Sequence, residues 1–360
     1  MRAFIGTVPF TIIEAINYVV SNEVQDADLY LVKVFADAEK VGKQIEETGV
    51  FQNVYIVEDV LLTYPITVKK CMNVVKNGKN IIRALEKKKY DYCYYNNSGW
   101  VINYIFFTRI LKKNPDVKNI FLEHGYISYI RRYDQRPWQV GMLVKMAGLK
   151  CMDGTMLDEI HMFEPELNCV EQNGKIIKMK KFDKNNIRLK EALNKSFHYD
   201  TENNEYKDKR VIIMEQGPLK VEFDKAAFWN PILEILDLKQ VIIKAHPRQK
   251  NSDFNGRGIA ISRNHTLPWE IETLNHNMND KVQITIFSGA CTSSKMLFGD
   301  EPTVIFLYKL LPVDYSFLGT ELVQFADKVG ELYQDRSKYF IPETLGEFKE
   351  YCQKIGIAKE

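Results

Sequence analysis

The apolar positions in the first half of the chain follow two alternating patterns. Short continuous apolar runs, typical of strands buried on both faces, predict strands at 2–8, 28–35, 53–59, 90–95 and 119–125. Apolar residues that recur every three or four positions predict helices at 10–21, 36–49, 67–89 and 100–113. This alternation predicts a parallel sheet covered by helices on both faces.

A second series of the same kind fills the C-terminal half. Strands are predicted at 210–217, 240–247, 258–264, 281–289 and 301–308, and helices at 228–236, 268–276, from about Thr292, and at 343–356. Between the two series, Ser196 to Arg210 is polar and has few apolar residues to bury, which is typical of a linker. We therefore expect an α/β chain with two Rossmann-like domains, 1–195 and 210–360, joined by a linker at 196–209 and facing a central cleft.

Composition narrows the class of protein. The chain has 360 residues, enough for two domains, and 49 basic against 47 acidic residues give a net charge of +2, which offers no argument for a nucleic-acid partner. The six cysteines form no CxxC pair, so we expect reduced thiols in a cytoplasmic protein. The N-terminal stretch lacks the apolar run and cleavage site of a signal peptide, so we expect none. No run of 18 apolar residues occurs, so we expect no transmembrane helix. A local basic patch at the inner face of the membrane, and a homodimer, stay open.

Unusual residues stand at the carboxyl ends of three predicted strands, where ligands bind in open α/β sheets. The first strand end carries Glu123, His124 and Gly125. Gly125 permits a sharp exit and close approach of a ligand, and Glu123 has the chemistry of a general base whose pKa is raised by partial burial. The alternative is that Glu123 caps the next helix and His124 is an ordinary polar residue.

The second strand end carries His246, Pro247 and Arg248. Pro247 ends the strand and directs the loop, and a histidine that protonates near neutral pH suits a phosphate partner. The alternative is a strand-end histidine without a role. The strand at 210–217 also ends in a loop, and we include its Gln216 and Gly217 among the donor-binding residues.

The third strand end leads to Thr292, Ser293 and Ser294, which we place at the start of a helix. Free N–H groups there favour anions, and the hydroxyls add donors; ordinary capping is the alternative. Glu270 and Glu272 lie between the histidine and serine stretches, where a carboxylate can accept from ribose hydroxyls or simply favour a helix start.

The stretch from Asn96 to Trp100 follows another strand. Its Asn96 and Ser98 are candidate acceptor contacts, or a helix cap. The chain has no GxGxxG, no Walker loop and no DxD motif in a suitable loop, and its histidines lack metal-ligand spacing, so we expect no metal.

Along the chain, the motifs follow the order Glu123-His124-Gly125, His246-Pro247 and Ser293-Ser294. In this order they resemble the motifs of the bacterial sialyltransferases of GT-B fold, which include the lipooligosaccharide and capsule enzymes and are related to polysialyltransferases. That family carries a D/E-D/E-G motif, an HP motif and a serine pair. The stretch "KAHPR" is especially similar to the lipooligosaccharide type. The resemblance covers about Leu122 to Lys295, through short motifs only, and His124 stands where the family has a second acid.

The resemblance implies an inverting, metal-independent transfer of sialic acid from the donor CMP-Neu5Ac to a glycan acceptor, free or lipid-linked, on the bacterial surface. It makes Glu123 the base, His246 a contact of the departing CMP phosphate, and Glu270 the ribose ligand. The same resemblance gives phosphate binding to Ser293 and Ser294.

Three alternatives stay open. A polyol-phosphate transferase using CDP-glycerol would make His124 the base, although its usual "WHGTP" is replaced here by "EHGYI". A CMP-Kdo transferase is a close chemical relative. A carbohydrate-binding or scaffold protein with a degenerate transferase fold is the non-enzyme alternative.

Overall fold

A computed structural model of the chain describes residues 1–35, 37–58, 67, 69, 72, 85, 88–96, 101–132, 157–202, 204–217, 221–247, 249 and 251–360. The chain divides into two compact units, Met1–Tyr199 and Asp200–Glu360. The division falls within the stretch at 196–209 that the sequence analysis treats as a linker. Most of the helix predicted at 67–89 lies outside the described residues.

The first unit is an α/β unit built on a parallel sheet. Its strands are β1 (Arg2–Gly6), β2 (Ala27–Val32), β3 (Asn53–Val57), β4 (Tyr92–Tyr95), β5 (Lys118–Leu122), β6 (Glu159–Met162) and β7 (Lys175–Lys178). Its helices are α1 (Pro9–Ser21), α2 (Ala38–Thr48), α4 (Val101–Lys113), α5 (Ile127–Ile130) and α7 (Ile187–Ser196). Within the described residues, the strand order is β3-β2-β1-β4-β5-β6-β7, with every pairing parallel.

Local sequence explains how these elements begin and end. The helix α1 starts with Pro9, whose missing N–H costs nothing at a first helical position, and the Thr11 hydroxyl accepts from the Thr7 N–H at 2.9 Å. The helix α2 ends at Gly49, which adopts a left-handed φ of 64°. All six residues of β2 are buried, as expected for a strand covered on both faces. The helix α7 packs against α1 and α2 and belongs to this unit.

The second unit repeats the architecture. Its strands are β8 (Val211–Met214), β9 (Val241–Lys244), β10 (Ala260–Ile261), β11 (Val282–Thr285), β12 (Thr303–Phe306) and β13 (Tyr339–Phe340). Its α-helices are α8 (Lys225–Ile235), α9 (Trp269–Asn275), α10 (Gly289–Ser293), α11 (Thr320–Glu331) and α12 (Leu345–Lys354), and a π-helical turn at Ser294–Phe298 continues α10. The described strands follow the order β10-β9-β8-β11-β12-β13, again all parallel.

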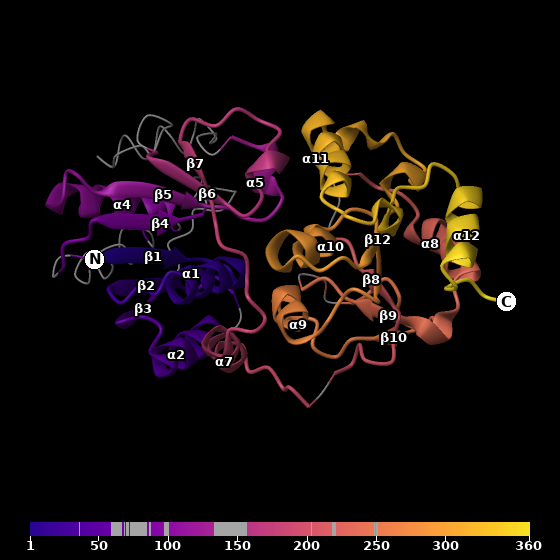
Figure 1. Cartoon of the computed structure of the whole chain (residues 1–360), viewed down its shortest axis with the longest axis horizontal. Helices are drawn as coiled ribbons and strands as arrows, with labels where there is room; N and C mark the ends of the chain where they lie inside the picture. The colour runs from indigo at the N-terminus through magenta and orange to yellow at the C-terminus, as the bar shows by residue number, and fades with distance from the viewer. Residues whose placement is uncertain are drawn as a thin grey trace. The chain divides into compact units, whose positions relative to one another are not determined.

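Helices cover both faces of this second sheet. The helices α9 and α10 lie on one side of the strands, and α8 and α12, which pack on each other, lie on the other side (Figure 1). The prediction of two parallel-sheet α/β units is confirmed. None of the helices in the described part of the chain has the length and apolar character needed to cross a bilayer.

Candidate functional site

The second unit has a point where the strand order reverses. From β8 the chain proceeds to β9 and β10 on one side, then returns to β11, β12 and β13 on the other. In open α/β sheets, such a reversal between adjacent strands opens a crevice at their carboxyl ends, and ligands bind there. Here the Gln216 side-chain oxygen, just after β8, accepts from the Phe287 N–H, just after β11, at 3.1 Å. This hydrogen bond joins the two strand ends that form the reversal.

His246 lies beside the same strand ends. Its half-buried ring packs on Gly217, so closely that a Cβ atom at residue 217 would lie 2.9 Å from the imidazole Nε2. Only glycine leaves room for the ring in this position. Pro247 is exposed next to it, and Arg248 lies outside the described residues. The structure thus brings the predicted residues Gln216, Gly217 and His246 together.

Glu215 supports the histidine loop, and the sequence analysis did not single it out. Its carboxylate is buried and accepts from the Asp253 N–H at 2.6 Å and the Ser252 hydroxyl at 3.2 Å. Burial raises the pKa of Glu215, and hydrogen bonds from the backbone of Asp253 and His246 oppose that rise. A carboxylate that receives these hydrogen bonds fixes the loop that carries His246.

Lys244 is a second residue whose role sequence reasoning missed. It ends β9, is 7% exposed, and its ammonium donates to the backbone carbonyls of Asn264, His265 and Leu267 at 3.1, 3.0 and 2.9 Å. Burial lowers the pKa of Lys244 to about 8. Three acceptors satisfy its three N–H groups, so the lysine ties down the loop that leads into α9.

Glu270 and Ser293 meet across α9 and α10. The Ser293 hydroxyl donates to the Ala290 carbonyl at 2.8 Å and lies near the Glu270 carboxylate. Burial raises the pKa of Glu270, while Lys244 and Ser293 oppose the rise. Two residues predicted separately as ribose and phosphate ligands are therefore neighbours. Glu272, also named in the sequence analysis, is buried and its carboxylate lies 3.7 Å from His276.

The predicted helix start at Thr292 is wrong. The helix α10 begins at Gly289, and Ser288 caps it by accepting from the Ala290 N–H. Thr292, Ser293 and Ser294 consequently lie further along the helix and do not supply its free N–H groups. Ser294 is fully buried, and its hydroxyl oxygen accepts from the Gln283 side chain at 3.2 Å.

In the first unit, Glu123 follows β5 and is fully buried. Its Oε2 accepts from the Tyr129 hydroxyl and from the Phe163 N–H, the latter at 2.8 Å. The Tyr129 hydroxyl in turn accepts from the Glu164 N–H at 3.3 Å. Burial raises the pKa of Glu123 to about 8, against the two hydrogen bonds, so the carboxyl is mostly protonated at neutral pH. The other oxygen, Oε1, has no hydrogen-bond partner among the described residues.

His124 and Gly125 occupy the more open positions. The His124 ring is half-buried, with its edge toward Phe10, and its backbone N–H donates to the Ser128 hydroxyl. Gly125 has a φ of 60°, and none of the described residues lies within 4 Å of the position that a Cβ would take. The glycine suits this left-handed turn, which other residues rarely adopt.

The order of the first sheet also reverses, between β1 and β4. Asn96 follows β4 at this reversal and is 3% exposed. Ser98 lies outside the described residues. No group of three or more His, Cys, Asp or Glu side chains that could hold a metal ion occurs in the described part of the chain.

The raised pKa of Glu123 predicts a pH-dependent stability. The folded protein holds this proton more tightly than the unfolded chain, in which a glutamate has a pKa of about 4.3. The stabilisation is therefore fully present below that value and is lost as the pH rises through about 8. The side chain of Glu123→Gln cannot ionise, so this variant keeps its stability as the pH rises. The difference in unfolding free energy between Glu123→Gln and wild type should therefore increase by on the order of 1–3 kcal/mol from about pH 5 to about pH 8.5.

Urea unfolding at a series of pH values measures this difference. The matched control is Glu46→Gln, which changes an exposed glutamate on α2 and should give a curve parallel to wild type. A Glu123→Gln curve that also runs parallel would show that the carboxyl titrates normally.

Comparisons with known proteins support the fold. No protein-family model matches the chain, and no curated protein matches it by sequence. The solved structure of the glycotransferase of kitacinnamycin is similar, with a TM-score of 0.51 and 10% identity over 98% of this chain and 90% of that one. CalG4, the calicheamicin glycosyltransferase, gives a TM-score of 0.47 and 11% identity over 98% and 89%. At 10% identity, the similarity to the kitacinnamycin protein establishes the fold alone, which is the expected GT-B class.

Proposed function

We propose that the chain is a GT-B glycosyltransferase that moves sialic acid from CMP-Neu5Ac to a terminal sugar, galactose, of a bacterial surface glycan. The observation that carries this proposal is the packing of α9 against α10, because these helices bear Glu270 and Ser293, two residues that the sialyltransferase motifs assign to one nucleotide. His246 follows β9 at the carboxyl edge of the same sheet.

The residue types suit the chemistry. A CMP-sugar loses its phosphate from an anomeric carbon through an oxocarbenium-like transition state, and negative charge builds up on the leaving phosphate. A protonated His246 would donate to that phosphate, and Ser293 would add a second donor. The Glu270 carboxylate would accept from the ribose hydroxyls. A single displacement by the acceptor oxygen would invert the anomeric centre, and the sequence offers no DxD loop for a metal-dependent route.

The acceptor hydroxyl must lose its proton to a base, and Glu123 and His124 are the two candidates. A base has to come within about 2.6–3.2 Å of the hydroxyl it deprotonates. Glu123 has no exposed surface and its Oε2 is already hydrogen-bonded, whereas His124 is half-buried as a whole, with its Nδ1 shielded from solvent. This difference favours His124 as the base and gives Glu123 the task of holding the end of β5 through Tyr129 and Phe163.

The greater burial of Glu123 compared with His124 also favours a second candidate function. A polyol-phosphate transferase that uses CDP-glycerol would rely on a histidine in the place of His124. Transfer of Kdo from CMP-Kdo would use the donor-binding residues of the sialyltransferase proposal unchanged.

Product analysis separates these candidates. The purified chain is incubated with CMP-Neu5Ac, CMP-Kdo or CDP-glycerol and a galactose-terminated acceptor, with and without EDTA, and products are identified by mass spectrometry. We expect a sialylated product that forms equally well with EDTA. Melting-temperature shifts with CMP, CDP and UDP provide an independent reading, because a ligand that binds only the folded state stabilises it. Stabilisation by UDP alone would contradict every CMP- or CDP-based candidate.

Single substitutions of the two serines should have opposite consequences. Ser293→Ala should weaken CMP binding by about 1–3 kcal/mol, since it removes a donor to a charged group, with little loss of stability. Ser294→Ala leaves the buried Gln283 amide without its partner, so it should cost about 1–3 kcal/mol of stability and leave CMP affinity unchanged. Calorimetry with CMP and urea unfolding of both variants measure the two quantities. Equal effects on CMP binding would mean that Ser294 reaches the nucleotide after all.

A further inference from the structure

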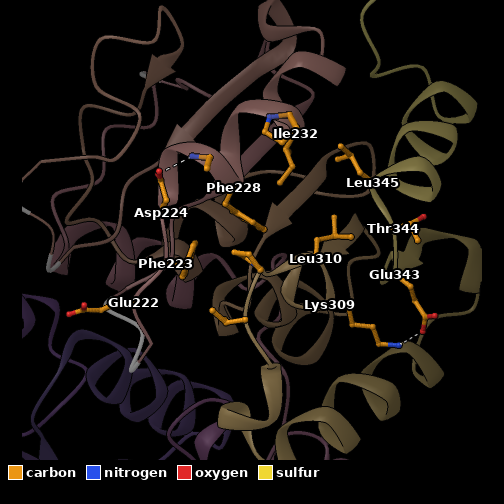
Figure 2. A pocket seen from close by; sticks show the side chains of 14 residues that line it. Glu222, Phe223, Asp224, Phe228, Ile232, Lys309, Leu310, Glu343, Thr344 and Leu345 are labelled. Atoms are coloured by element: carbon orange, nitrogen blue, oxygen red, sulfur yellow. Dashed lines mark hydrogen bonds and ion pairs between the residues drawn. The ribbon is translucent and has the colours of Figure 1, made fainter.

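A groove of about 650 Å³ lies in the second unit, on the face of the sheet that α8 and α12 cover (Figures 1 and 2). Its walls are the residues before and along α8, the segment after β12, and the start of α12. Both helices begin at the groove, because helices that follow parallel strands start at the carboxyl edge of the sheet. The groove has the volume of a small-molecule site.

The body of the groove is apolar. Six side chains make up most of this part: Phe223, Phe228, Ile232, Leu310, Val313 and Leu345. Phe223 and Phe228 form an edge-to-face pair with their ring centres 5.6 Å apart. Leu345 stands at the first position of α12 and is 39% exposed, an apolar side chain left in contact with water. A ligand with an apolar body would remove this surface from water.

The rim of the groove is acidic. Among the described residues that line the groove, Glu222, Asp224 and Glu343 carry carboxylates and Lys309 carries an ammonium, which Glu343 holds at 2.7 Å. The Asp224 carboxylate also accepts from the Ala227 N–H at 3.0 Å. Figure 2 shows this ion pair at the edge of the groove, with Asp224 at the start of α8. The lining therefore carries a net charge of −2 when these four groups are ionised.

The backbone adds one further acceptor. Pro231 lies inside α8 and has no N–H, so the Ala227 carbonyl, four residues earlier, lacks the helical hydrogen bond that residue 231 would give. Ala227 and Pro231 both line the groove. Acceptors thus outnumber donors around an apolar space that contains an aromatic pair, and aromatic faces attract cations.

We propose that this groove binds an organic ammonium ion with an apolar body. The apolar part would lie against the phenylalanines and Leu345, and the ammonium would lie at the acidic rim. Glu270 and Ser293 belong to α9 and α10, on the other face of the sheet. The groove and these two residues thus lie on opposite faces of the sheet, and the test of the groove uses no glycosyl donor.

Calorimetry with three eight-carbon probes that differ only in their head group tests the assignment. The probes are octylammonium, octanol and octanoate at neutral pH. Octylammonium should bind the whole chain about tenfold or more tightly than octanoate, with octanol between them, because the rim attracts one charge and repels the other. Equal binding of the two ions, or no binding of octylammonium, would overturn the proposal.

Leu345→Lys locates the site. The new ammonium would stand inside the groove, so octylammonium binding should weaken by about tenfold and octanoate binding should strengthen. Ile187→Lys is the matched control, because Ile187 is also an exposed apolar residue at the first position of a helix, α7, in the first unit. A cation at the start of a helix is electrostatically unfavourable, and this effect on stability is present in both variants. If Ile187→Lys changes probe binding as much as Leu345→Lys does, the probes do not occupy the groove.

Discussion

His124→Ala should lower kcat by about 10²–10⁴-fold, the usual cost of removing a general base. His124 is half-buried, whereas the neighbouring Glu123 carboxyl has no exposed surface. The loss should fall on kcat, with CMP affinity nearly unchanged, because Glu270 and Ser293, the proposed donor ligands, belong to the second unit.

Glu123→Gln is the partner experiment in the same assay. Glutamine keeps an oxygen that can accept from Tyr129 and Phe163, so turnover should stay within about tenfold of wild type. Melting temperatures of both variants check that folding is intact. A dead Glu123→Gln enzyme beside an active His124→Ala enzyme would return the role of base to the glutamate, as the D/E-D/E-G resemblance implies.

His246→Ala should reduce kcat by about 10²–10³-fold and weaken CMP binding by about 1–3 kcal/mol. The imidazole would contact the phosphate in the ground state and in the transition state, so both quantities should change. Steady-state kinetics with CMP-Neu5Ac and calorimetry with CMP measure them. His265→Ala, which keeps the backbone carbonyl that Lys244 binds, is the control histidine of the same unit and should behave as wild type.

Gly217→Ala tests the position of the His246 ring without removing it. The added methyl group would lie 2.9 Å from Nε2, so the ring has to move. We expect a loss of kcat in the same direction as for His246→Ala. Normal activity of Gly217→Ala would mean that the observed ring position is not the catalytic one.

The sequence predicted the sheets well because their strands are almost entirely apolar. A strand such as β2, buried along its whole length, is visible as a continuous apolar run. The strands β6, β7 and β13 were not predicted. The edge strand β7 is short and has lysines at both ends, and β13 has only two residues. Elements of this kind depend on pairing with a neighbour, which a single sequence does not display.

The candidate site was visible in the sequence only in part. His246 was expected at a strand end and follows β9, whereas Glu270 and Ser293 lie on α9 and α10. The supporting contacts of Glu215 with Ser252 and Asp253 join residues about 37 positions apart, and no local pattern encodes them. The start of α10 was misplaced because its segment offers several hydroxyl residues that could cap a helix. In the structure, the residue that caps it is Ser288.

The division of the chain at Tyr199 and Asp200 has an evolutionary consequence. Each unit is one uninterrupted segment, and the final helix α12 packs on α8 within the second unit. A single recombination event near residue 199 could therefore exchange one whole half of the molecule for its counterpart in a homologue. Such an exchange would leave every strand pairing of both sheets intact. One crossover in the gene could thus join the unit that contains Glu123 to a homologous version of the unit that contains His246.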